Sequence, residues 1–414
     1  MREYKNAPMD WMPIIPDGWE CYRAKFVFKE RNEKGNINSL QLLSPTQKYG
    51  VIPQSLYNKL SGMRAVELKE DTDFCQLKTI HRNDFCISLR SFQGGFEMSA
   101  YEGVVSPAYR VFFANKKICP GYYKYLFKEY NFIHKMNYNA QSLRDGKPIS
   151  FDDFGDVYIP YPPLDEQSCI ANYLDSKCAA IDEAIERHKK IIEKLNEYKV
   201  TFLTHVVTHG VNETNKYRNT SIAWAPIIPT HWRVVPVKRL VASIHSGKNI
   251  TSEDIDANGE FPVYGGNGLR GYYTHFNCDG DAILIGRQGA LAGNIHQVSG
   301  KYWATDHALI THNTEIVQMT YLAFLFEAMN LNQYAFETAA QPGLAASKIL
   351  ALPTILPPLK EQEKIVNVIK KQQQNIDVAK CRHQDIISKL EEYRKSIIYN
   401  AVTGKIDCRT EMQA

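Results

Sequence analysis

The chain of 414 residues contains two copies of one sequence framework. The segment from Tyr4 to Trp19 recurs from Tyr217 to Trp232, where 8 of 16 positions are identical. The segment from Pro162 to Thr208 recurs from Pro357 to Thr403, where 20 of 47 positions are identical. Such self-similarity is the signature of an internal repeat. We therefore expect two related structural units, in agreement with a length greater than that of one ordinary core.

The sequence between the framework segments differs between the two copies. The offset falls from 213 to 195 residues, so the intervening segments, about residues 20–161 and 233–356, differ in length by 18. They share little identity. A framework kept around divergent inserts is typical of a scaffold that presents two different recognition surfaces. Tandem duplication followed by drift is the alternative, but drift does not spare the ends and erase the middles.

Each longer framework segment predicts a long helix. Prolines followed by acidic residues at Pro162–Glu166 mark a helix start, and the glycines Gly210 and Gly404 mark the stops. Side chains suited to a helix seam recur every seven residues in both copies: Leu174, Ile181, His188, Leu195 and Phe202, then Ile369, Ile376, His383, Leu390 and Ile397. Two matched heptad seams predict a coiled coil.

The inserts predict mixed α+β globules. Glycine-punctuated β-like runs span residues 261–273 and 281–289, and short helices are expected at Tyr123–Tyr130 and Met319–Met329. The expected fold class is α+β, with two β-rich domains separated by two long helices. The expected boundaries are 1–161 for the first domain, 162–210 for its helix, 211–356 for the second domain, and 357–414 for the second helix and tail.

Composition narrows the class of protein. The chain is 44% hydrophobic and 23% charged, as in soluble globular proteins, and its net charge of +4 permits nucleic-acid binding without arguing for it. None of the nine cysteines form a C-x-x-C pair, which favours small core residues in a reducing cytosol over metal or disulfide sites. The polar N-terminus and the short apolar run Tyr321–Phe326 predict a cytoplasmic protein without a membrane span.

Three motifs suggest chemistry, and each has a plainer interpretation. Residues 266–271 match G-x-G-x-x-G, but strand-like residues follow, so a hairpin turn is expected. The Pro-Pro pairs at 162–163 and 357–358 lack the flanking residues of an amino-methyltransferase motif and read as helix starts. His188 and His383 are expected to set register on the seam. We expect no metal site, no catalytic residue and no enzyme activity in this chain.

Taken together, the framework residues resemble a known family. Twin Ile-Pro-x-x-Trp segments, twin Pro-Pro-Leu-x-Glu-Gln helix starts and the end beginning at Ala401-Val-Thr-Gly resemble the specificity subunits of type I restriction-modification systems. The resemblance covers almost the whole chain. It implies two target-recognition domains, joined by two helices that pair antiparallel. Each domain would read one half of a bipartite DNA site, and the coiled coil would set the spacing.

The resemblance also implies partners. Double-stranded DNA would be bound together with two modification subunits, which methylate adenine with S-adenosylmethionine. ATP-driven restriction subunits would join them. S-adenosylmethionine, ATP and Mg²⁺ are therefore expected in the partner subunits, and no cofactor is expected in this chain.

Base reading requires forked or amide side chains at base edges and cations at phosphates. In the second domain we expect base contacts from Asn267, Arg270, Arg287 and Gln288, and phosphate contacts from Lys248, His275 and Lys301. In the first domain the candidates are Arg90, Gln93 and Arg110, with a backbone-binding set of Lys116, Lys117, Lys124 and Arg144. The first insert lacks the Gly-Arg-x-Gly of residues 286–289, and its nearest equivalent is residues 89–95.

Two other functions stay open from the residues. The chain could be the reading module of a self-contained restriction and methylation enzyme, which the missing methyltransferase and nuclease motifs oppose. It could instead be a scaffold that joins partners through its coiled coil and does not bind DNA. Salt-dependent binding to duplex DNA separates the scaffold from the DNA reader.

Overall fold

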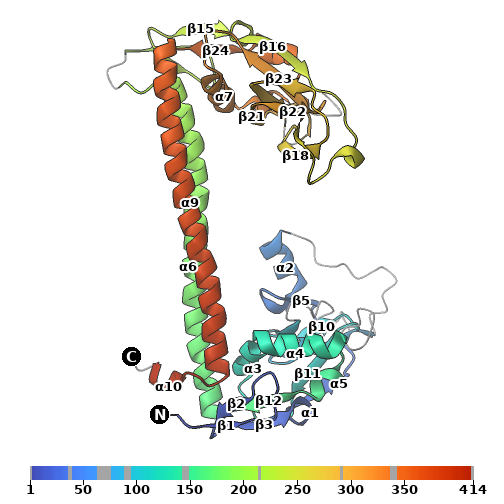
Figure 1. Cartoon of the computed structure of the whole chain (residues 1–414). Coiled ribbons are helices and arrows are strands. Elements are labelled where there is room, and N and C mark those ends of the chain that lie inside the picture. Colours follow the sequence, from blue (N-terminus) through green and yellow to red (C-terminus); the bar gives the residue numbers. More distant parts are fainter. Residues whose placement is uncertain are drawn as a thin grey trace. The chain divides into compact units, whose positions relative to one another are not determined.

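The computed structural model describes residues 2–35, 40–62, 76–87, 95–141, 149–212, 216–289, 292–335 and 343–411 (Figure 1). The chain forms two compact units, Met1–His188 with Asp385–Ala414, and Lys189–Gln384. Each unit contains one β-rich domain and parts of both long helices. The predicted α+β fold class, with two such domains and two long helices, is confirmed. Among the described helices, none is both long and apolar enough to cross a membrane.

The domain of the first unit consists of short antiparallel sheets and small helices. The paired strands are β1 (Tyr4–Asn6) with β2 (Ile14–Pro16), β3 (Glu20–Arg23) with β12 (Tyr158–Tyr161), β5 (Leu43–Thr46) with β6 (Gly50–Pro53), and β7 (Lys78–Ile80) with β10 (Gly103–Val105). A four-stranded sheet has the order β4 (Phe28–Arg31), β11 (Arg110–Ala114), β8 (Phe85–Ile87) and β9 (Phe96–Met98). The helices are α1 (Ala24–Val27), α2 (Gln54–Ser61), α3 (Pro120–Leu126), α4 (Tyr130–Gln141) and α5 (Phe151–Gly155).

The domain of the second unit repeats this plan. Its paired strands are β13 (Tyr217–Asn219) with β14 (Ile227–Pro229), and β15 (Arg233–Pro236) with β24 (Pro353–Leu356). One sheet has the order β16 (Val241–Ser246), β23 (Ala308–Asn313), β20 (Ala282–Gly286) and β21 (Ile295–Val298); another has the order β18 (Gly268–Tyr273), β17 (Phe261–Gly265), β22 (Lys301–Ala304) and β19 (Cys278–Asp279). The helices are η3 (Val237–Arg239), η4 (Ser252–Asp254), α7 (Met319–Ala328), η6 (Leu331–Tyr334) and α8 (Ala346–Ala351).

The two inserts therefore share a topology although their sequences differ. In each, the strand that follows β3 or β15 along the chain (β4 or β16) lies at the edge of the four-stranded sheet, beside β11 or β23. Their cores are chemically different. In the first, phenylalanine rings fill the interior, with Phe112 and Phe154 centroids 4.9 Å apart. In the second, aliphatic residues such as Leu322 and Leu325 surround Trp232 and Tyr321. The two inserts thus pack different residues into one topology, in agreement with the little sequence identity between them.

The two long helices are α6 (Leu164–His209) and α9 (Leu359–Val402), and α10 (Cys408–Glu411) follows. The predicted seam is confirmed at its ends, because Leu174, Ile181, Ile369 and Ile376 are buried. The helix stops are confirmed as well. Gly210 and Gly404 follow the last turns with φ of 74° and 71°, a left-handed conformation that glycine adopts without strain.

The helices run antiparallel in each unit, where the same ion pair recurs. In the first unit the Arg394 guanidinium contacts the Asp182 carboxylate. In the second, Lys199 Nζ lies 3.5 Å from Asp377 Oδ1. Asp182 corresponds to Asp377, and Lys199 to Arg394, at the repeat offset of 195 residues. Each unit thus holds one copy of a contact that the duplicated sequence makes with itself, as in an isologous interface.

A buried glutamine joins each domain to the start of its helix. Gln362 Nε2 donates to the carbonyls of Pro357 (2.9 Å) and Ile316 (3.2 Å), and its Oε1 accepts from the backbone N–H of Gln318 (2.8 Å). The equivalent Gln167 donates to Pro162 and accepts from the Cys119 N–H, both at 2.8 Å. The Pro-Pro-Leu-x-Glu-Gln segment is therefore more than a helix start. Its glutamine fixes the segment that enters α3 or α7.

A hydrogen bond between a tyrosine and the end of a long helix also recurs in both units. Tyr4 donates to the carbonyl of Gly404 at 3.2 Å, and Tyr217 donates to that of His209 at 3.4 Å. In the first unit this places the N-terminal strands against the end of α9, as expected if the chain's ends meet at the first domain.

One helix expectation was wrong. Residues 123–130 do not form one helix, because α3 ends at Leu126 and α4 begins at Tyr130. The helix expected at Met319–Met329 is present as α7.

We expect Gln362→Ala to lower the free energy of unfolding by about 1–3 kcal/mol, because it leaves buried backbone groups without partners. The exposed neighbour Glu363 provides the control, since Glu363→Ala should change stability by less than about 0.5 kcal/mol. Urea unfolding followed by circular dichroism measures both. An equal loss in the two variants would contradict the role of the buried amide.

Candidate nucleic-acid interface

Two loops of the second unit pack backbone against backbone at one edge of its sheets. One is the turn between β17 and β18, and the other follows β20. A Cβ added at Gly266 would lie 2.9 Å from the His307 carbonyl oxygen and 3.7 Å from the Arg287 backbone nitrogen. Only glycine permits this approach. The contact places Asn267 and Arg287, two of the predicted candidates, in one region.

Arg287 is held at its backbone and its side chain. Its N–H donates to the His307 carbonyl at 2.9 Å, and its carbonyl accepts from the Leu344 N–H at 2.8 Å. The guanidinium Nη1 donates to Ser246 Oγ at 3.3 Å, and Ser246 Oγ donates to the Asp306 carbonyl at 3.0 Å. Arg287 is half-buried, its backbone is held by hydrogen bonds, and its guanidinium has a defined hydrogen-bond partner.

The neighbouring candidates surround this arginine. Asn267 is exposed in the turn, and its Oδ1 accepts from Asn294 Nδ2 at 2.9 Å. Arg270 is exposed on β18, with its side chain over Gly265. Gln288 is exposed beside Arg287.

Lys248 is exposed in the loop after β16, and its backbone pairs with the end of β22. The Lys248 N–H donates to the Ala304 carbonyl at 2.9 Å, and Trp303 Nε1 donates to the Lys248 carbonyl at 3.2 Å. The structure therefore brings five of the seven predicted residues of this domain to one region, and Lys248 shares it with Asn267, Arg270, Arg287 and Gln288.

The other two lie at the opposite end of the β18-β17-β22-β19 sheet. Lys301 begins β22, and its Nζ lies 4.7 Å from the centre of the Phe276 ring. His275 follows β18, and its Nδ1 lies 2.9 Å from Thr274 Oγ1. The parallel pairing of Val263 with Trp303 separates this end of the sheet from the 266–267 turn. His275 and Lys301 thus do not join the Arg287 region.

The candidates of the first unit fall into separate places. Arg110 begins β11, with its guanidinium 3.6 Å from Glu30, and burial together with Arg110 lowers the pKa of Lys78. Lys116 and Lys117 follow the far end of β11, where Lys116 Nζ lies 3.4 Å from the Tyr22 ring centre. Lys124 on α3 pairs with Asp175 of α6 at 2.9 Å. Arg90, Gln93 and Arg144 lie outside the described residues.

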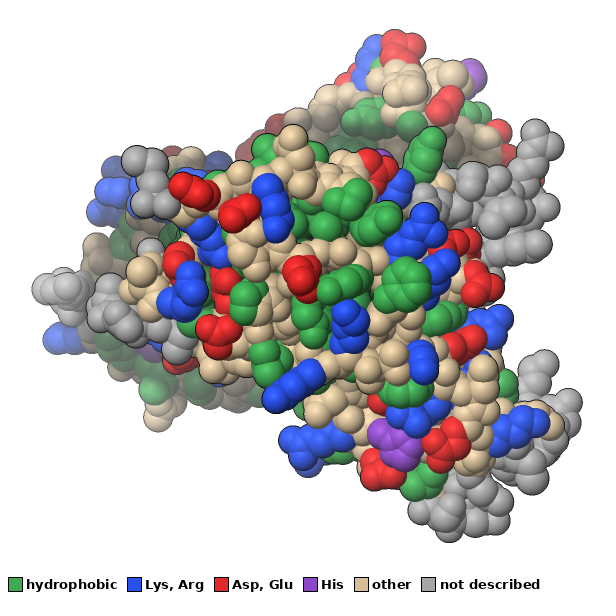
Figure 2. Space-filling view, turned by 90° about the horizontal axis from the view of Figure 1, so that it is seen from below, with side chains coloured by type: hydrophobic (Ala, Val, Ile, Leu, Met, Phe, Trp, Pro, Cys, Tyr) green, Lys and Arg blue, Asp and Glu red, His purple; other side chains and the backbone are tan. Residues whose placement is uncertain are grey.

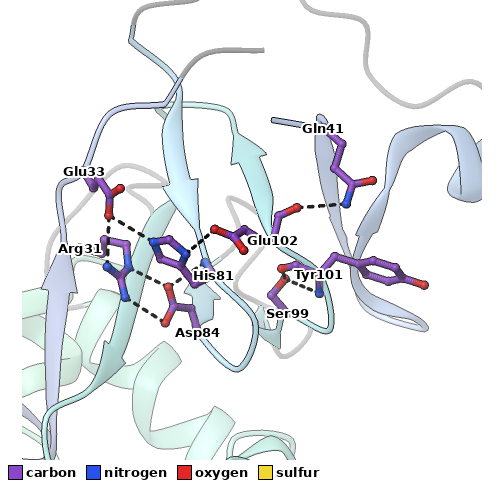
Figure 3. A network of polar contacts seen from close by, with 8 residues as sticks. All are labelled: Arg31, Glu33, Gln41, His81, Asp84, Ser99, Tyr101 and Glu102. Carbon is purple, nitrogen blue, oxygen red and sulfur yellow. Dashed lines mark hydrogen bonds and ion pairs between the residues drawn. The ribbon is translucent and has the colours of Figure 1, made fainter. Parts of the chain in front are cut away.

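A polar network beside β4 and β8 was not predicted from the sequence (Figure 3). Arg31 Nε donates to Asp84 Oδ2 at 2.7 Å, which fixes the carboxylate that also accepts from the His81 backbone N–H at 2.9 Å. His81 Nδ1 lies 3.0 Å from Glu102, and Nε2 lies 3.3 Å from Glu33. These residues come from three separate stretches of the chain, around residues 31–33, 81–84 and 102, so no single local motif indicated them.

Charge is mixed on the face of the first unit seen from below. Figure 2 shows lysine and arginine side chains interspersed with aspartate and glutamate among the described residues there. A phosphate backbone favours a surface of positive charge. The described residues of this face therefore do not form a surface of uniformly positive charge.

The alternative interpretations of motifs are resolved by the strands and helices around them. Residues 266–271 form the turn and first part of the β17–β18 hairpin, with Gly268 at φ 90°, so the hairpin interpretation is confirmed. The Pro-Pro pairs precede α6 and α9. Among the described residues, no group of three or more histidine, cysteine or acidic side chains is placed to hold a metal ion.

Comparison with known families then identifies the chain. The model of the type I restriction modification DNA specificity domain matches residues 16–197 and again residues 229–388. These two matches cover more than half of the chain. The chain belongs to this family. The two matches coincide with the two copies of the fold, so each β-rich domain is one specificity domain.

Curated relatives agree with this assignment. The EcoprrI specificity subunit of Escherichia coli is 36% identical over 135 residues, which are 32% of this chain and 33% of that protein. The match thus spans only a third of that relative's length. A putative MjaX specificity subunit of Methanocaldococcus jannaschii is 26% identical over 420 residues, covering 96% of this chain and 95% of that protein.

Solved structures share the fold of this specificity-domain protein. A chain from a study of complex assembly and conformational transition of the type I R-M system matches with a TM-score of 0.70 at 14% identity, covering 95% of this chain and 99% of that chain. The HsdS subunit from Thermoanaerobacter tengcongensis matches with a TM-score of 0.54 at 14% identity, covering 97% and 100%.

Proposed function

We propose that this chain is the DNA sequence-specificity subunit of a type I restriction-modification complex. Each domain reads one half of a bipartite site, and the coiled coil sets the spacing between the halves. The observation that carries the proposal is the doubled specificity domain, one fold built twice with different loops at its sheet edges. Duplicated scaffolds with divergent loops suit two independent readings of one duplex.

The Arg287 region supplies the chemistry of base reading in the second domain. An arginine fork matches the N7 and O6 acceptors of guanine in the major groove, and amide side chains match adenine or other base edges. Asn267, Arg270 and Gln288 are the amide and guanidinium groups around it, and Lys248 supplies a phosphate contact. We keep His275 and Lys301 as phosphate contacts of the same domain, at the other end of its sheet.

In the first domain, Arg110 remains the proposed base contact among the described residues. Lys116 and Lys117 remain phosphate contacts. Lys124 is engaged with Asp175 of α6, so its ammonium must leave a carboxylate to reach DNA. Of the four lysine and arginine candidates described in this domain, we rank it last.

The bond-making chemistry belongs, in this proposal, to partner subunits. Modification subunits bind S-adenosylmethionine and transfer its methyl group to adenine, and ATP-dependent restriction subunits cleave with Mg²⁺. Purified alone, the chain should therefore neither methylate nor cleave DNA. Methyl transfer by the isolated protein would favour the self-contained enzyme instead, and a complex that showed no salt-dependent binding to duplex DNA would favour the scaffold.

Exchange of one domain tests the proposal directly. Replacing residues 20–161 with the corresponding segment of a related subunit should change one half-site and leave the other as it was, because the framework recurs around unlike inserts. Methylation mapping of a genome that expresses the complex gives both half-sites. A chimera in which both halves changed would show that the domains do not read independently.

Two substitutions separate base reading from phosphate binding in the second domain. Arg287→Ala should cost about 1–3 kcal/mol of binding and relax one base position, since a fork onto guanine is lost. Lys301→Ala should weaken binding to all sequences alike and reduce the slope of log affinity against log salt by about one. Titrations over several salt concentrations measure both effects. Full affinity and an unchanged site in Arg287→Ala would remove Arg287 from the reading set.

Lengthening both helices tests the role of the coiled coil. One heptad is inserted after Lys190 and one after the equivalent Asp385, which preserves the seam. Each insertion adds about 10 Å of helix, or about three base pairs of DNA. The mapped half-sites should keep their bases and move apart by that amount. An unchanged gap in an active, folded complex would show that the helices do not set the spacing.

A further inference from the structure

We propose that Ser246 and Asn294 are positioning residues, which fix the hydrogen-bonding atoms that Arg287 and Asn267 present to a base pair. Neither residue contacts DNA in this inference. Each acts through a reading side chain of the second domain. The inference rests on the proposed function and assigns part of the specificity of that domain to residues behind its surface.

Ser246 has only one possible hydrogen-bond arrangement in this place. A hydroxyl carries a single proton, and that of Ser246 is donated to the Asp306 carbonyl at 3.0 Å. Toward Arg287 the Ser246 oxygen can therefore only accept through a lone pair, and the guanidinium, which can only donate, supplies the bond from Nη1 at 3.3 Å. The relay from Arg287 through Ser246 to a backbone carbonyl cannot reverse.

This relay fixes the direction of the arginine fork. The Arg287 backbone is bound on both sides, to His307 and Leu344, so the side chain begins from a fixed point. Anchoring Nη1 at Ser246 leaves the other donors of the guanidinium for a ligand. A fork held in one direction loses less conformational freedom on binding and discriminates better between bases.

Asn294 acts in the same way on the turn. Its backbone carbonyl accepts from the Gly286 N–H at 2.8 Å, which ties Asn294 to the end of β20, directly before Arg287. Its side-chain Nδ2 donates to Asn267 Oδ1 at 2.9 Å. With the oxygen of Asn267 turned toward Asn294, the Nδ2 donor is the end of the amide that faces outward.

The turn between β17 and β18 is also supported by β21, the strand that follows Asn294. His296 of β21 lies against Gly268, where an added Cβ would be 3.0 Å from the imidazole Cε1. Burial lowers the pKa of His296, which favours the neutral form of the ring beside the turn. The Asn267 side chain is therefore held by the Asn294 amide, and the adjoining Gly268 packs against the His296 ring.

The resulting surface presents donors from both reading residues. Arg287 offers only N–H groups, and Asn267 offers Nδ2. Asp306, whose carboxylate lies 4.0 Å from His307 Nε2, is an acidic side chain beside this region. Base edges rich in acceptors, guanine above all, fit this arrangement.

The first experiment removes the relay. In the complex of the full chain with its modification subunits, Ser246→Ala should reduce discrimination at one base position of one half-site about tenfold or more. The slope against salt should stay unchanged, because no phosphate contact is lost. Ser246→Thr keeps the hydroxyl and should restore discrimination. Methylation mapping and competition with single-base variants of the site measure these effects.

The second experiment inverts an amide. In Asn294→Asp the carboxylate can only accept, so Asn267 must turn to donate Nδ2 inward and present Oδ1 outward. Preference at that position should move toward bases with an amino donor, adenine or cytosine. Ser299→Asp, an exposed residue in the β21–β22 turn, controls for the added charge. It should leave the preference unchanged.

A change of preferred base in Asn294→Asp, or a rescued loss in the Ser246 pair, supports the inference, since a merely structural role does not select a new base. Uniform loss of affinity across sequences, or unchanged discrimination in both variants while the wild-type complex reads its bipartite site, overturns it. A wild-type complex without such a site would overturn the proposed function itself, and the two failures are thereby distinguished.

Discussion

The antiparallel pairing of two copies of one helix is the constraint on which this structure depends. Because α6 and α9 are two copies of one repeat, a contact between them can recur at the repeat offset. Asp182 with Arg394 and Asp377 with Lys199 are the plainest example. Exposed ion pairs contribute little free energy, so the buried heptad residues stabilise the pair and the charges favour its direction and register.

The sequence of each domain can change while the domain stays attached to the start of its long helix. The buried Gln167 and Gln362 bind backbone groups rather than side chains, so they tolerate sequence change in the segments that they hold. Around these anchors one domain has a core of phenylalanine rings and the other an aliphatic core. Cores of similar volume and pattern specify the same topology with different residues. Framework and insert therefore obey different constraints in one chain.

The sequence predicted those features that depend on local period and composition. The heptad seams, the helix stops at Gly210 and Gly404 and the hairpin at residues 266–271 each follow from a short stretch of chain. The helix expected at Tyr123–Tyr130 failed because a run of apolar and aromatic residues does not show where a turn divides two helices. The shared topology of the inserts was also not predicted, because it depends on strand pairs that are distant in sequence.

The candidate site likewise combines residues that a short stretch of sequence indicates with residues that are distant in the chain. Glycine-flanked polar residues indicated Arg287 and Asn267 as candidates, since in each case the glycines and the candidate side chain lie in one short stretch of sequence. Ser246 precedes Arg287 by 41 residues and had no local signal at all. Yet the direction of a guanidinium depends on such a partner as much as on the loop that carries it. A recognition loop transferred alone would keep its donors and lose their orientation, whereas a whole domain carries both. Under the proposed function, the domain rather than the loop is therefore the unit whose exchange should transfer a DNA preference.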